Sequence, residues 1–313
     1  MKHIFVLNPA AGKSKAEREI LPNIIEAAKQ KGIDYSIHRT GNVGEATSFV
    51  KRTLEQNPDE TFRFYAIGGD GTIQETAHGM IGFPNAELAA IPAGSGNDFV
   101  RNFGEAKNFY YYDAQFNGTA HPIDLIRINS HICVNMINIG LDSHTAAFQQ
   151  TVKLTTPFRG TASYVVALAK NFAKNPAADM RITLDDGSVY DGEFSAFSIA
   201  NGIFCGGGFH AAPKAYVDDG LMDVMMIKRI SRLRFVGLVG NYHSGTHVDN
   251  PKCEDVVTYA KAKSLTIDLR SATPICIDGE IIFESDLSID ILPKAVNFVV
   301  PTNCRFPGFE AEV

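Results

Sequence analysis

The apolar and polar positions divide the chain into two parts with different secondary-structure patterns. In the first part, short apolar runs alternate with longer segments whose apolar residues recur every three or four positions. The apolar runs are 3–7, 35–40, 62–67 and 87–91, and the helical segments between them are 14–28, 44–54 and 72–81. This alternation is typical of a parallel sheet covered by helices, so we predict an N-terminal α/β domain.

Two of the predicted helices begin with a Ser/Thr-x-x-Glu sequence. Ser14 precedes Glu17 by three residues, and Thr72 precedes Glu75 by the same spacing. The spacing predicts capping boxes, in which these side chains bond to the first amide groups of their own helix. Pro22 lies inside the first helical segment and is expected to kink it, because proline has no amide hydrogen.

Beyond about residue 123 the pattern changes and strands dominate. Strand-like runs occur at 123–129, 132–141, 180–184, 188–199, 221–227, 264–269, 275–277, 281–283 and 287–292, and helical periodicity at 160–174 and 231–242. Asp-Gly pairs at 186–187 and 278–279 predict tight turns. We therefore predict a second, mainly antiparallel domain with a β-sandwich as its expected form. The boundary near 125–130 has no flexible linker, so the domains are expected to meet tightly.

Composition limits the compartment and the partners. The net charge of −6 argues against nucleic acid as a partner. Met1 leads directly into a strand pattern, so no signal peptide is expected, and the longest apolar stretches are too short to span a bilayer. The five cysteines lack Cys-x-x-Cys spacing, which favours reduced thiols in a cytoplasmic protein.

The most informative stretch follows the third apolar run and reads Gly68, Gly69, Asp70, Gly71, Thr72. Glycines allow a close approach of the backbone to a ligand, and the N-terminus of the helix that follows suits a phosphate. A carboxylate fits there if Mg²⁺ lies between it and the phosphates. A hairpin turn is the alternative, but a helical pattern follows instead of a second strand.

The standard nucleotide motifs are absent. Gln74 stands where the dinucleotide fingerprint requires glycine, and Leu7 stands where a P-loop requires one. Four small or glycine-containing loops nevertheless follow the predicted strands, at 8–13, 40–41, 68–72 and 92–98. Loops after parallel strands share one edge of the sheet, where ligands bind. We therefore expect one shared anion site there, with four unrelated turns as the alternative.

Two acidic loops stand out in the second domain. Asp218, Asp219 and Gly220 precede a strand, and Asp278, Gly279 and Glu280 form the tip of a predicted hairpin. Asp278 and Glu280 are expected to face one side of that hairpin. Both loops could equally be ordinary turns. If the hairpin tip faces the phosphate loops, a carboxylate there can take a proton from a hydroxyl.

Taken together, these motifs resemble the soluble diacylglycerol kinase and sphingosine kinase catalytic-domain superfamily, in particular its bacterial lipid kinases. The matching residues run through nearly the whole chain: Asn8-Pro9-x-x-Gly12-Lys13, 68–72, Pro92-x-Gly94-Ser95-Gly96-Asn97-Asp98-Phe99, Asp124, 212–221 and 278–280. The resemblance implies a phosphofructokinase- or NAD-kinase-like nucleotide domain at 1–127, with a return segment at 296–313. The β-rich lipid domain would then span 128–295. The 68–72 motif alone is shared with NAD kinases.

The resemblance also implies roles for individual residues. The ATP site would be lined by residues of four loops: Asn8, Pro9, Ala10, Ala11, Gly12, Lys13, Thr40, Gly68, Gly69, Asp70, Gly71, Thr72, Ile73, Gln74, Gly94, Ser95 and Asn97. Asp70, Asp98 and Asp124 would support a Mg²⁺–water network, with Asp70 also catalytic. Asp219 and the carbonyls of Tyr216 and Leu221 would hold a structural Mg²⁺. Glu280 would be the general base, assisted by Asp278. Gln74 replaces a usual asparagine and Ser95 a usual threonine.

The implied activity is ATP-dependent phosphorylation of a lipid hydroxyl, with diacylglycerol as the leading acceptor. An NAD kinase and a non-catalytic nucleotide- or lipid-binding regulator are the alternatives. The segment 228–239 places Lys228, Arg229, Arg232 and Arg234 beside Phe235, Leu238 and Val239. Basic residues beside an apolar face suit an anionic membrane surface, so we expect a cytoplasmic protein with peripheral membrane contact. A plain solvated helix is the alternative, and a homodimer is left open.

Overall fold

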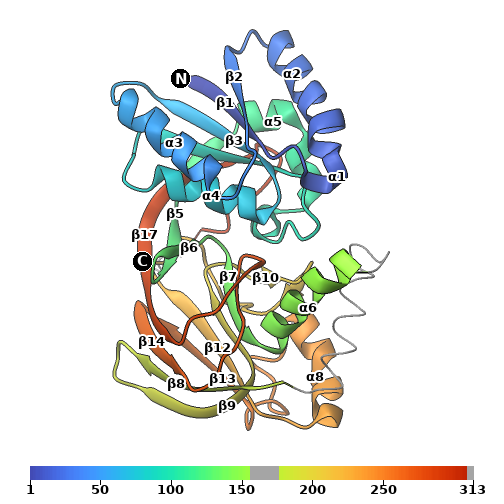
Figure 1. Cartoon of the computed structure of the whole chain (residues 1–313), viewed down its shortest axis with the longest axis vertical. Coiled ribbons are helices and arrows are strands. Elements are labelled where there is room, and N and C mark those ends of the chain that lie inside the picture. The colour runs from blue at the N-terminus through green and yellow to red at the C-terminus, as the bar shows by residue number, and fades with distance from the viewer. Residues whose placement is uncertain (156–175, 309–313) are drawn as a thin grey trace. The chain divides into compact units, whose positions relative to one another are not determined.

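The computed structural model describes residues 1–155 and 176–308, with side chains described through residue 148 in the first range. The helix expected at 160–174 lies outside the described residues. The chain divides into two compact units. Unit 1 is Met1–Leu125, Val217–Asp219 and Pro293–Val313, and unit 2 is Ile126–Tyr216 and Gly220–Leu292. Figure 1 shows the elements of both.

Unit 1 contains the predicted parallel sheet. Its strands are β1 (Lys2–Leu7), β2 (Tyr35–Arg39), β3 (Phe62–Gly68) and β4 (Ala86–Pro92), in the order β2–β1–β3–β4. The last part of β17 (Asp286–Val300) runs parallel to β4, with Asn297 opposite Glu87. A chain segment almost three hundred residues from the N-terminus therefore completes this sheet.

Helices cover both faces of this sheet (Figure 1). They are α1 (Ala11–Lys15), α2 (Leu21–Gln30), α3 (Glu45–Gln56), α4 (Asp70–Met80), α5 (Tyr112–Phe116) and the 3₁₀ turns Phe99–Phe103 and Ala106–Tyr110. Ile24 of α2 and Phe116 of α5 pack with Phe5 and Tyr65 on one face. On the other face α3 and α4 pack together, and a Cβ at Gly79 would lie 2.7 Å from the Thr47 carbonyl oxygen.

Both predicted capping boxes are wrong. Ser14 has a left-handed backbone. Pro22 lies in the first turn of α2, directly after a π-helical turn (Ala16–Ile20), and not inside a helix as expected. The helix after β3 begins at Asp70, two residues earlier than expected, and no side chain caps it. The Glu75 carboxylate instead accepts the Ala46 N–H of the neighbouring helix α3, at 3.2 Å. Tertiary packing therefore decided which amides this carboxylate satisfies.

Unit 2 is a mainly antiparallel sheet, as predicted. Its strands are the end of β5 (Thr119–Ile128), β6 (His131–Cys133), β7 (Met136–Gly140), β8 (Ala178–Leu184), β9 (Val189–Ala200), β12 (Met222–Lys228), β13 (Val257–Ala262), β14 (Ser264–Leu269), β15 (Ile275–Ile277), β16 (Glu280–Ile282) and the start of β17. The order is β16–β15–β7–β9–β8–β14–β17, and β12 and β13 continue from β9. The pattern missed β13, and the expected strand 132–141 is divided into β6 and β7.

Two apolar clusters flank the strands of unit 2. Strand β12 is buried on both faces: Val224 and Met226 join the core between the strands, whereas Met225 and Ile227 face helix α8 (Arg232–Ser244). Helix α6 (Leu141–Thr155) and the short pair β10 (Phe204–Cys205) and β11 (Phe209–His210) complete the described elements. Among the described residues, no helix combines the length and apolar character needed to cross a bilayer.

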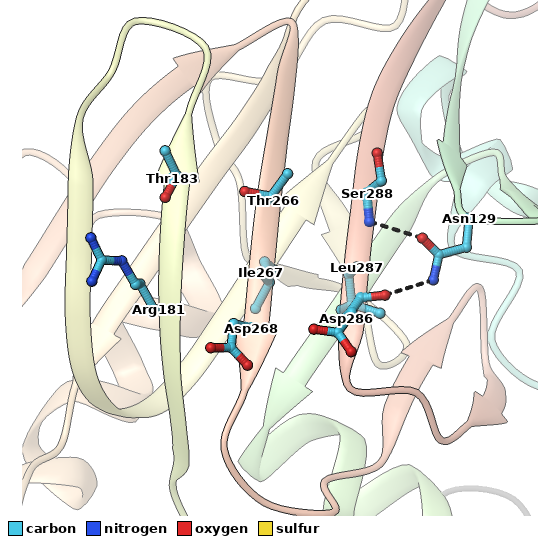
Figure 2. A pocket seen from close by; sticks show the side chains of 9 residues that line it. All are labelled: Asn129, Arg181, Thr183, Thr266, Ile267, Asp268, Asp286, Leu287 and Ser288. Atoms are coloured by element: carbon cyan, nitrogen blue, oxygen red, sulfur yellow. Dashed lines mark hydrogen bonds between the residues drawn. The ribbon is translucent and has the colours of Figure 1, made fainter.

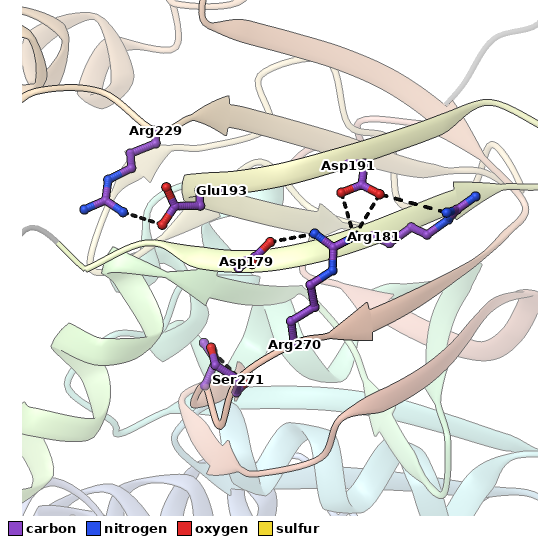
Figure 3. A network of polar contacts seen from close by, with 8 residues as sticks. Asp179, Arg181, Asp191, Glu193, Arg229, Arg270 and Ser271 are labelled. Carbon is purple, nitrogen blue, oxygen red and sulfur yellow. Dashed lines mark hydrogen bonds and ion pairs between the residues drawn. The ribbon is translucent and has the colours of Figure 1, made fainter.

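The outward face of β8 and β9 carries a network of ion pairs (Figure 3). Arg270 donates to Asp179 at 2.9 Å and to both carboxylate oxygens of Asp191 at 2.7 and 2.8 Å, and Arg229 pairs with Glu193. Exposed pairs of this kind contribute about 0–1 kcal/mol each. The network therefore explains a charged surface and does not by itself mark a site.

Candidate functional site

The carboxyl ends of the unit 1 strands bring the predicted loops together. The Thr40 N–H donates to the Leu7 carbonyl at 2.9 Å, and the Asn8 N–H donates to that of Ile67 at 3.0 Å. The Ala93 N–H donates to the Gly68 carbonyl at 2.5 Å. Loops after β1, β2, β3 and β4 therefore begin side by side at one edge, as expected for parallel strands.

The loop after β1 is wound tightly and includes α1, whose central residues do not have right-handed helical backbone angles. Gly12, Lys13 and Ser14 all have left-handed backbones, with φ of 59°, 59° and 67°. Asn8 turns the chain, since its Oδ1 accepts the Ala10 N–H at 3.1 Å. Left-handed conformations cost about 1–3 kcal/mol at non-glycine residues and concentrate at functional sites. The Lys13 side chain is exposed and has no acidic partner among the described residues, so its charge is available to an anion.

Glycines allow the loops after β3 and β4 to touch. A Cβ at Gly68 would lie 2.1 Å from Thr72 Oγ1, and a Cβ at Gly69 would lie 3.2 Å from the Gly94 Cα. A Cβ at Gly12 would lie 2.7 Å from the Ala93 carbonyl oxygen, which joins the first loop to the same contact. These positions require glycine because backbone or packed side-chain atoms occupy the space of a side chain.

Asp70 begins α4 at this edge. Its Oδ1 accepts the Phe99 N–H at 3.2 Å, and burial raises the pKa of its carboxyl, opposed by hydrogen bonds from backbone amides. Asp70 Oδ2 and Asp98 Oδ2 each lie 3.2 Å from the place that a Cβ would take at Gly96. Two carboxylate oxygens thus flank one small space, an arrangement that suits a hard cation and its water ligands.

Two residues that the sequence reasoning did not assign brace these loops. Arg101 lies 3.5 Å from the Asp98 carboxylate and donates to the Gly96 carbonyl at 3.4 Å. The Tyr110 hydroxyl donates to the Pro92 carbonyl, and its ring lies beneath the Lys15 ammonium. The three-residue spacing of Asp98 and Arg101 could have predicted the first contact, whereas nothing local indicated the second.

The remaining predicted nucleotide residues lie on α4 and in the loop after β4. Asn97 has a left-handed backbone, and its side-chain amide bonds to both the N–H and the carbonyl of Gly94 at 2.9 and 3.0 Å. Ile73 is a core residue whose N–H bonds to Gly69, and Gln74 is partly buried on α4. Ser95 is exposed at the tip of its loop. Asn97 therefore fixes the loop, and Ser95 is the side chain that it presents.

The other predicted acidic residues in this group are Asp124 and Asp219. Asp124 is fully buried in β5, and its described hydrogen bonds reach Val217 and Lys294. Asp219 belongs to unit 1, whereas Tyr216 and Leu221 belong to unit 2. In the part of the chain that the structure describes, no three His, Cys, Asp or Glu side chains gather in metal-binding geometry.

Asp278 and Glu280 do not share a face of a strand. Asp278 and Gly279 form a two-residue turn with φ of 48° and 95°, which confirms the turn but places Asp278 outside strand alternation. Its carboxylate accepts the N–H groups of Val134, Asn135 and Met136 at 2.6, 3.0 and 2.9 Å. Burial raises the pKa of this carboxyl to about 6.

Glu280 has a different environment from its neighbour. It is exposed at the start of β16, and no described hydrogen bond or ion pair joins it to Asp278. Its carboxylate is therefore available to an acceptor substrate, whereas that of Asp278 anchors the hairpin to the segment 133–136.

A shallow pocket of about 400 Å³ in unit 2 contains none of the predicted site residues. Figure 2 shows its lining, which consists of Asn129, Arg181, Thr183, Thr266, Ile267, Asp268, Asp286, Leu287 and Ser288 on β8, β14, β17 and the turn after β5. The Asn129 amide bonds to the backbone of Asp286 and Ser288, at 3.0 and 2.8 Å. This hollow lies over neighbouring strands of the unit 2 sheet.

Comparison with known proteins decides the family. Residues 2–128 match the diacylglycerol kinase catalytic domain, and residues 135–300 match the YegS C-terminal NAD kinase β-sandwich-like domain. The chain belongs to the YegS-like and diacylglycerol kinase family of lipid kinases. The resemblance seen in the sequence is thereby confirmed, and the protein is an enzyme of the kinase class.

Relatives of this lipid kinase span almost its full length. The Pseudomonas aeruginosa protein named "Probable lipid kinase YegS-like" is 29% identical over 93% of this chain and 92% of the relative. The diacylglycerol kinase of Bacillus subtilis is 26% identical over 88% of each chain. A crystal structure of a diacylglycerol kinase from Bacillus anthracis is similar with a TM-score of 0.69 and 20% identity, covering 96% of this chain and 97% of that one. The structural likeness confirms the two-domain fold.

Proposed function

We propose that this lipid kinase transfers the γ-phosphate of ATP to the hydroxyl of diacylglycerol and forms phosphatidic acid. The observation that carries the proposal is the contact, through glycines, of the loops after β1, β3 and β4 beside the start of α4 and Lys13, which has no acidic partner among the described residues. A helix N-terminus, left-handed loop amides and a free cation together favour a polyphosphate. The names of the relatives support a lipid acceptor.

The proposed ATP site consists of the residues expected from the resemblance. The loop 8–13 and Thr40 would surround the phosphates from β1 and β2, and the segments 68–74 and 94–97 from β3 and β4. Backbone amides supply most of the contacts in this arrangement, because the glycines leave no side chain between the backbone and the ligand.

The residues at Gly96 fit Mg²⁺. Two carboxylate oxygens flank a space that a Cβ would fill, and Mg²⁺ is typically held by one or two carboxylates, water and substrate phosphates. Asp70 and Asp98 would hold this ion, whereas Asp124, which the resemblance adds to the network, is fully buried and has backbone hydrogen-bond partners of its own. When bound, Mg²⁺ neutralises charge on the transferring phosphate. Asp219 and the Tyr216 and Leu221 carbonyls would hold a second, structural ion.

Glu280 is the proposed general base. The acceptor hydroxyl oxygen forms a bond to the γ-phosphorus, the bond from that phosphorus to the β,γ-bridging oxygen breaks, and the hydroxyl proton passes to Glu280. ADP leaves with the bridging oxygen. Asp278 would assist Glu280 by holding the hairpin in place, because its carboxylate accepts hydrogen bonds from three backbone amides.

The protein would work in the cytoplasm at an anionic membrane surface. On α8, Phe235 and Leu238 pack against the core, so the apolar face expected from the sequence is largely covered. Leu233 and Val236 are instead exposed, by 88% and 60%. Arg234 is paired with Asp255, whereas Arg232 is exposed and has no acidic partner among the described residues. Exposed aliphatic residues beside an exposed cation suit such a membrane.

A panel of acceptors tests the proposed function. The purified protein is incubated with γ-labelled ATP, Mg²⁺ and dispersed diacylglycerol, monoacylglycerol, ceramide, sphingoid base or polyprenol, with NAD as a separate arm. Labelled phosphatidic acid as the main product supports the proposal. Labelled NADP would instead establish the NAD kinase alternative, and ATP binding without any labelled product would establish a regulator. Size-exclusion chromatography of the purified protein with light scattering reports whether it is a homodimer.

A further inference from the structure

The chain passes between the two units at three places. These are after Leu125, around the short excursion Val217–Asp219, and before Pro293. Asp124 stands next to the first of these passages. Its hydrogen bonds lead to the other two, although the partners lie about 90 and 170 residues away in the sequence.

Both bonds are short and belong to unit 1. The Asp124 N–H donates to the Val217 carbonyl at 2.7 Å, and its Oδ1 accepts the Lys294 N–H at 2.7 Å. The Asp124 side chain has no exposed surface. A hydrogen bond from a backbone amide to a buried carboxylate is stronger than a neutral one, and losing it leaves a polar group without a partner.

Lys294 occupies an unusual point of β17. Its backbone is left-handed, with φ of 50°. The residues before it, through Asp290, pair with β14 of unit 2, and those from Asn297 onward pair with β4 of unit 1. A left-handed residue interrupts a strand and redirects it, and its N–H then needs another acceptor. The Asp124 carboxylate provides that acceptor.

We propose that Asp124 is a positioning residue that fastens the chain to one point of unit 1 at the three places where it passes between the units. It holds the redirected β17 through its side chain and the excursion 217–219, which carries Asp219, through its backbone. This inference rests on the proposed function for its effect on phosphate transfer. It differs from the role in a Mg²⁺ network, because fastening requires a hydrogen-bond acceptor and does not require a negative charge.

Two substitutions separate the two roles. Asp124→Asn retains an oxygen that can accept the Lys294 N–H and removes the charge, whereas Asp124→Ala removes both. Asp98→Asn is the matched control, because it removes a charge beside Asp70 at a position outside β17. Hydrogen exchange of the Lys294 amide is measured without substrate, and kcat and the KM for ATP are measured with the acceptor that the wild type uses.

Exchange at Lys294 is expected to accelerate by about tenfold or more in Asp124→Ala and to stay near the wild-type rate in Asp124→Asn. A small displacement of the reacting groups lowers the rate by up to about 10²-fold. We therefore expect kcat to fall in Asp124→Ala and to stay near the wild-type value in Asp124→Asn, with little change in the KM for ATP. Asp98→Asn should lose turnover with normal exchange.

The proposal is overturned if Asp124→Asn loses turnover while Lys294 stays protected, because the charge would then be what matters. It is equally overturned if the Lys294 amide loses its protection from exchange in a variant and that variant keeps its turnover. If Asp124→Ala does not fold, Asp124→Asn alone decides by the same two criteria. A wild type inactive on every lipid while exchange behaves as expected would reject the proposed function and leave the fastening intact.

Discussion

A Cβ at Gly94 would lie 2.6 Å from the Cα of Gly69, so the backbones of the loops after β3 and β4 are in direct contact. No real Cβ tolerates such a distance, and the neighbouring atom is backbone that cannot rotate away. The contact joins the loop that carries Asp70 to the loop that carries Asp98 at the proposed phosphate site.

Gly94→Ala is therefore expected to separate the two loops and weaken ATP binding by about tenfold or more, because polyphosphate contacts depend on this backbone position. The matched control is Gly237→Ala on α8, where a Cβ meets nothing within 4 Å and alanine favours the helix. Calorimetric ATP titration of both variants checks the prediction. Equal ATP affinity of Gly94→Ala and the wild type would contradict it.

Asp70→Asn should abolish turnover and leave the fold intact. Asparagine keeps an Oδ1 that can accept the Phe99 N–H, but it lacks the charge that would hold Mg²⁺ water ligands against the phosphates. The measurements are kcat at several Mg²⁺ concentrations and a thermal melt. Near-wild-type turnover at limiting Mg²⁺ would mean that Asp70 serves only to begin α4.

Glu280→Gln should lower kcat by about 10²–10⁴, the usual span for loss of a general base, with little effect on ATP affinity. Glu280 is exposed and makes no described contact with Asp278, so the change should not disturb the hairpin. Steady-state kinetics and ATP titration test this. A fall in kcat of less than about threefold, or a collapse of ATP binding, would move the base elsewhere.

Asp278 should behave as a structural group with its own pH dependence. Burial raises the pKa of its carboxyl from 3.8 in the unfolded chain to about 6 in the folded protein. The folded state therefore binds the proton more tightly, and stability falls as pH rises from about 4 to about 6, by at most about 1.4 kcal/mol per pH unit. Above pH 6 this contribution stays constant.

Asp278→Asn should remove this slope and also destabilise the protein at every pH, because an amide cannot accept all the N–H groups that the carboxylate does. Urea unfolding of both proteins between pH 4 and 7 gives the comparison. Parallel stability curves for the wild type and the variant would show that Asp278 does not titrate in this range.

The Leu233→Ser, Val236→Ser double variant should bind anionic vesicles about tenfold or more weakly, because it removes two exposed aliphatic side chains from α8. Arg232→Glu should weaken binding mainly at low salt, whereas Arg234→Glu should have a smaller effect because Arg234 is already paired with Asp255. Val189→Ser, which alters an exposed aliphatic residue of β9, is the control. Unchanged sedimentation with phosphatidylglycerol vesicles would exclude α8 as the membrane contact.

The sequence by itself determined the strand and helix alternation of unit 1, the antiparallel pattern of unit 2 and the convergence of the glycine loops. These features follow from local rules: apolar spacing sets the element type, and parallel strands place their following loops at one edge. The tight turn at Asp278 and Gly279 was also predictable, because the two-residue pair alone favours it.

Only the tertiary structure decided what several polar side chains do. Glu75 has the spacing of a cap for its own helix, yet it bonds to α3, because α3 packs close enough for its first amides to compete. Asp278 and Glu280 are two residues apart, but the segment 133–136 engages one carboxylate and leaves the other exposed. Asp124 meets Lys294 only because β17 returns to unit 1. Hydrogen-bond partners distant in sequence depend on how the whole chain packs, and no local pattern contains that information.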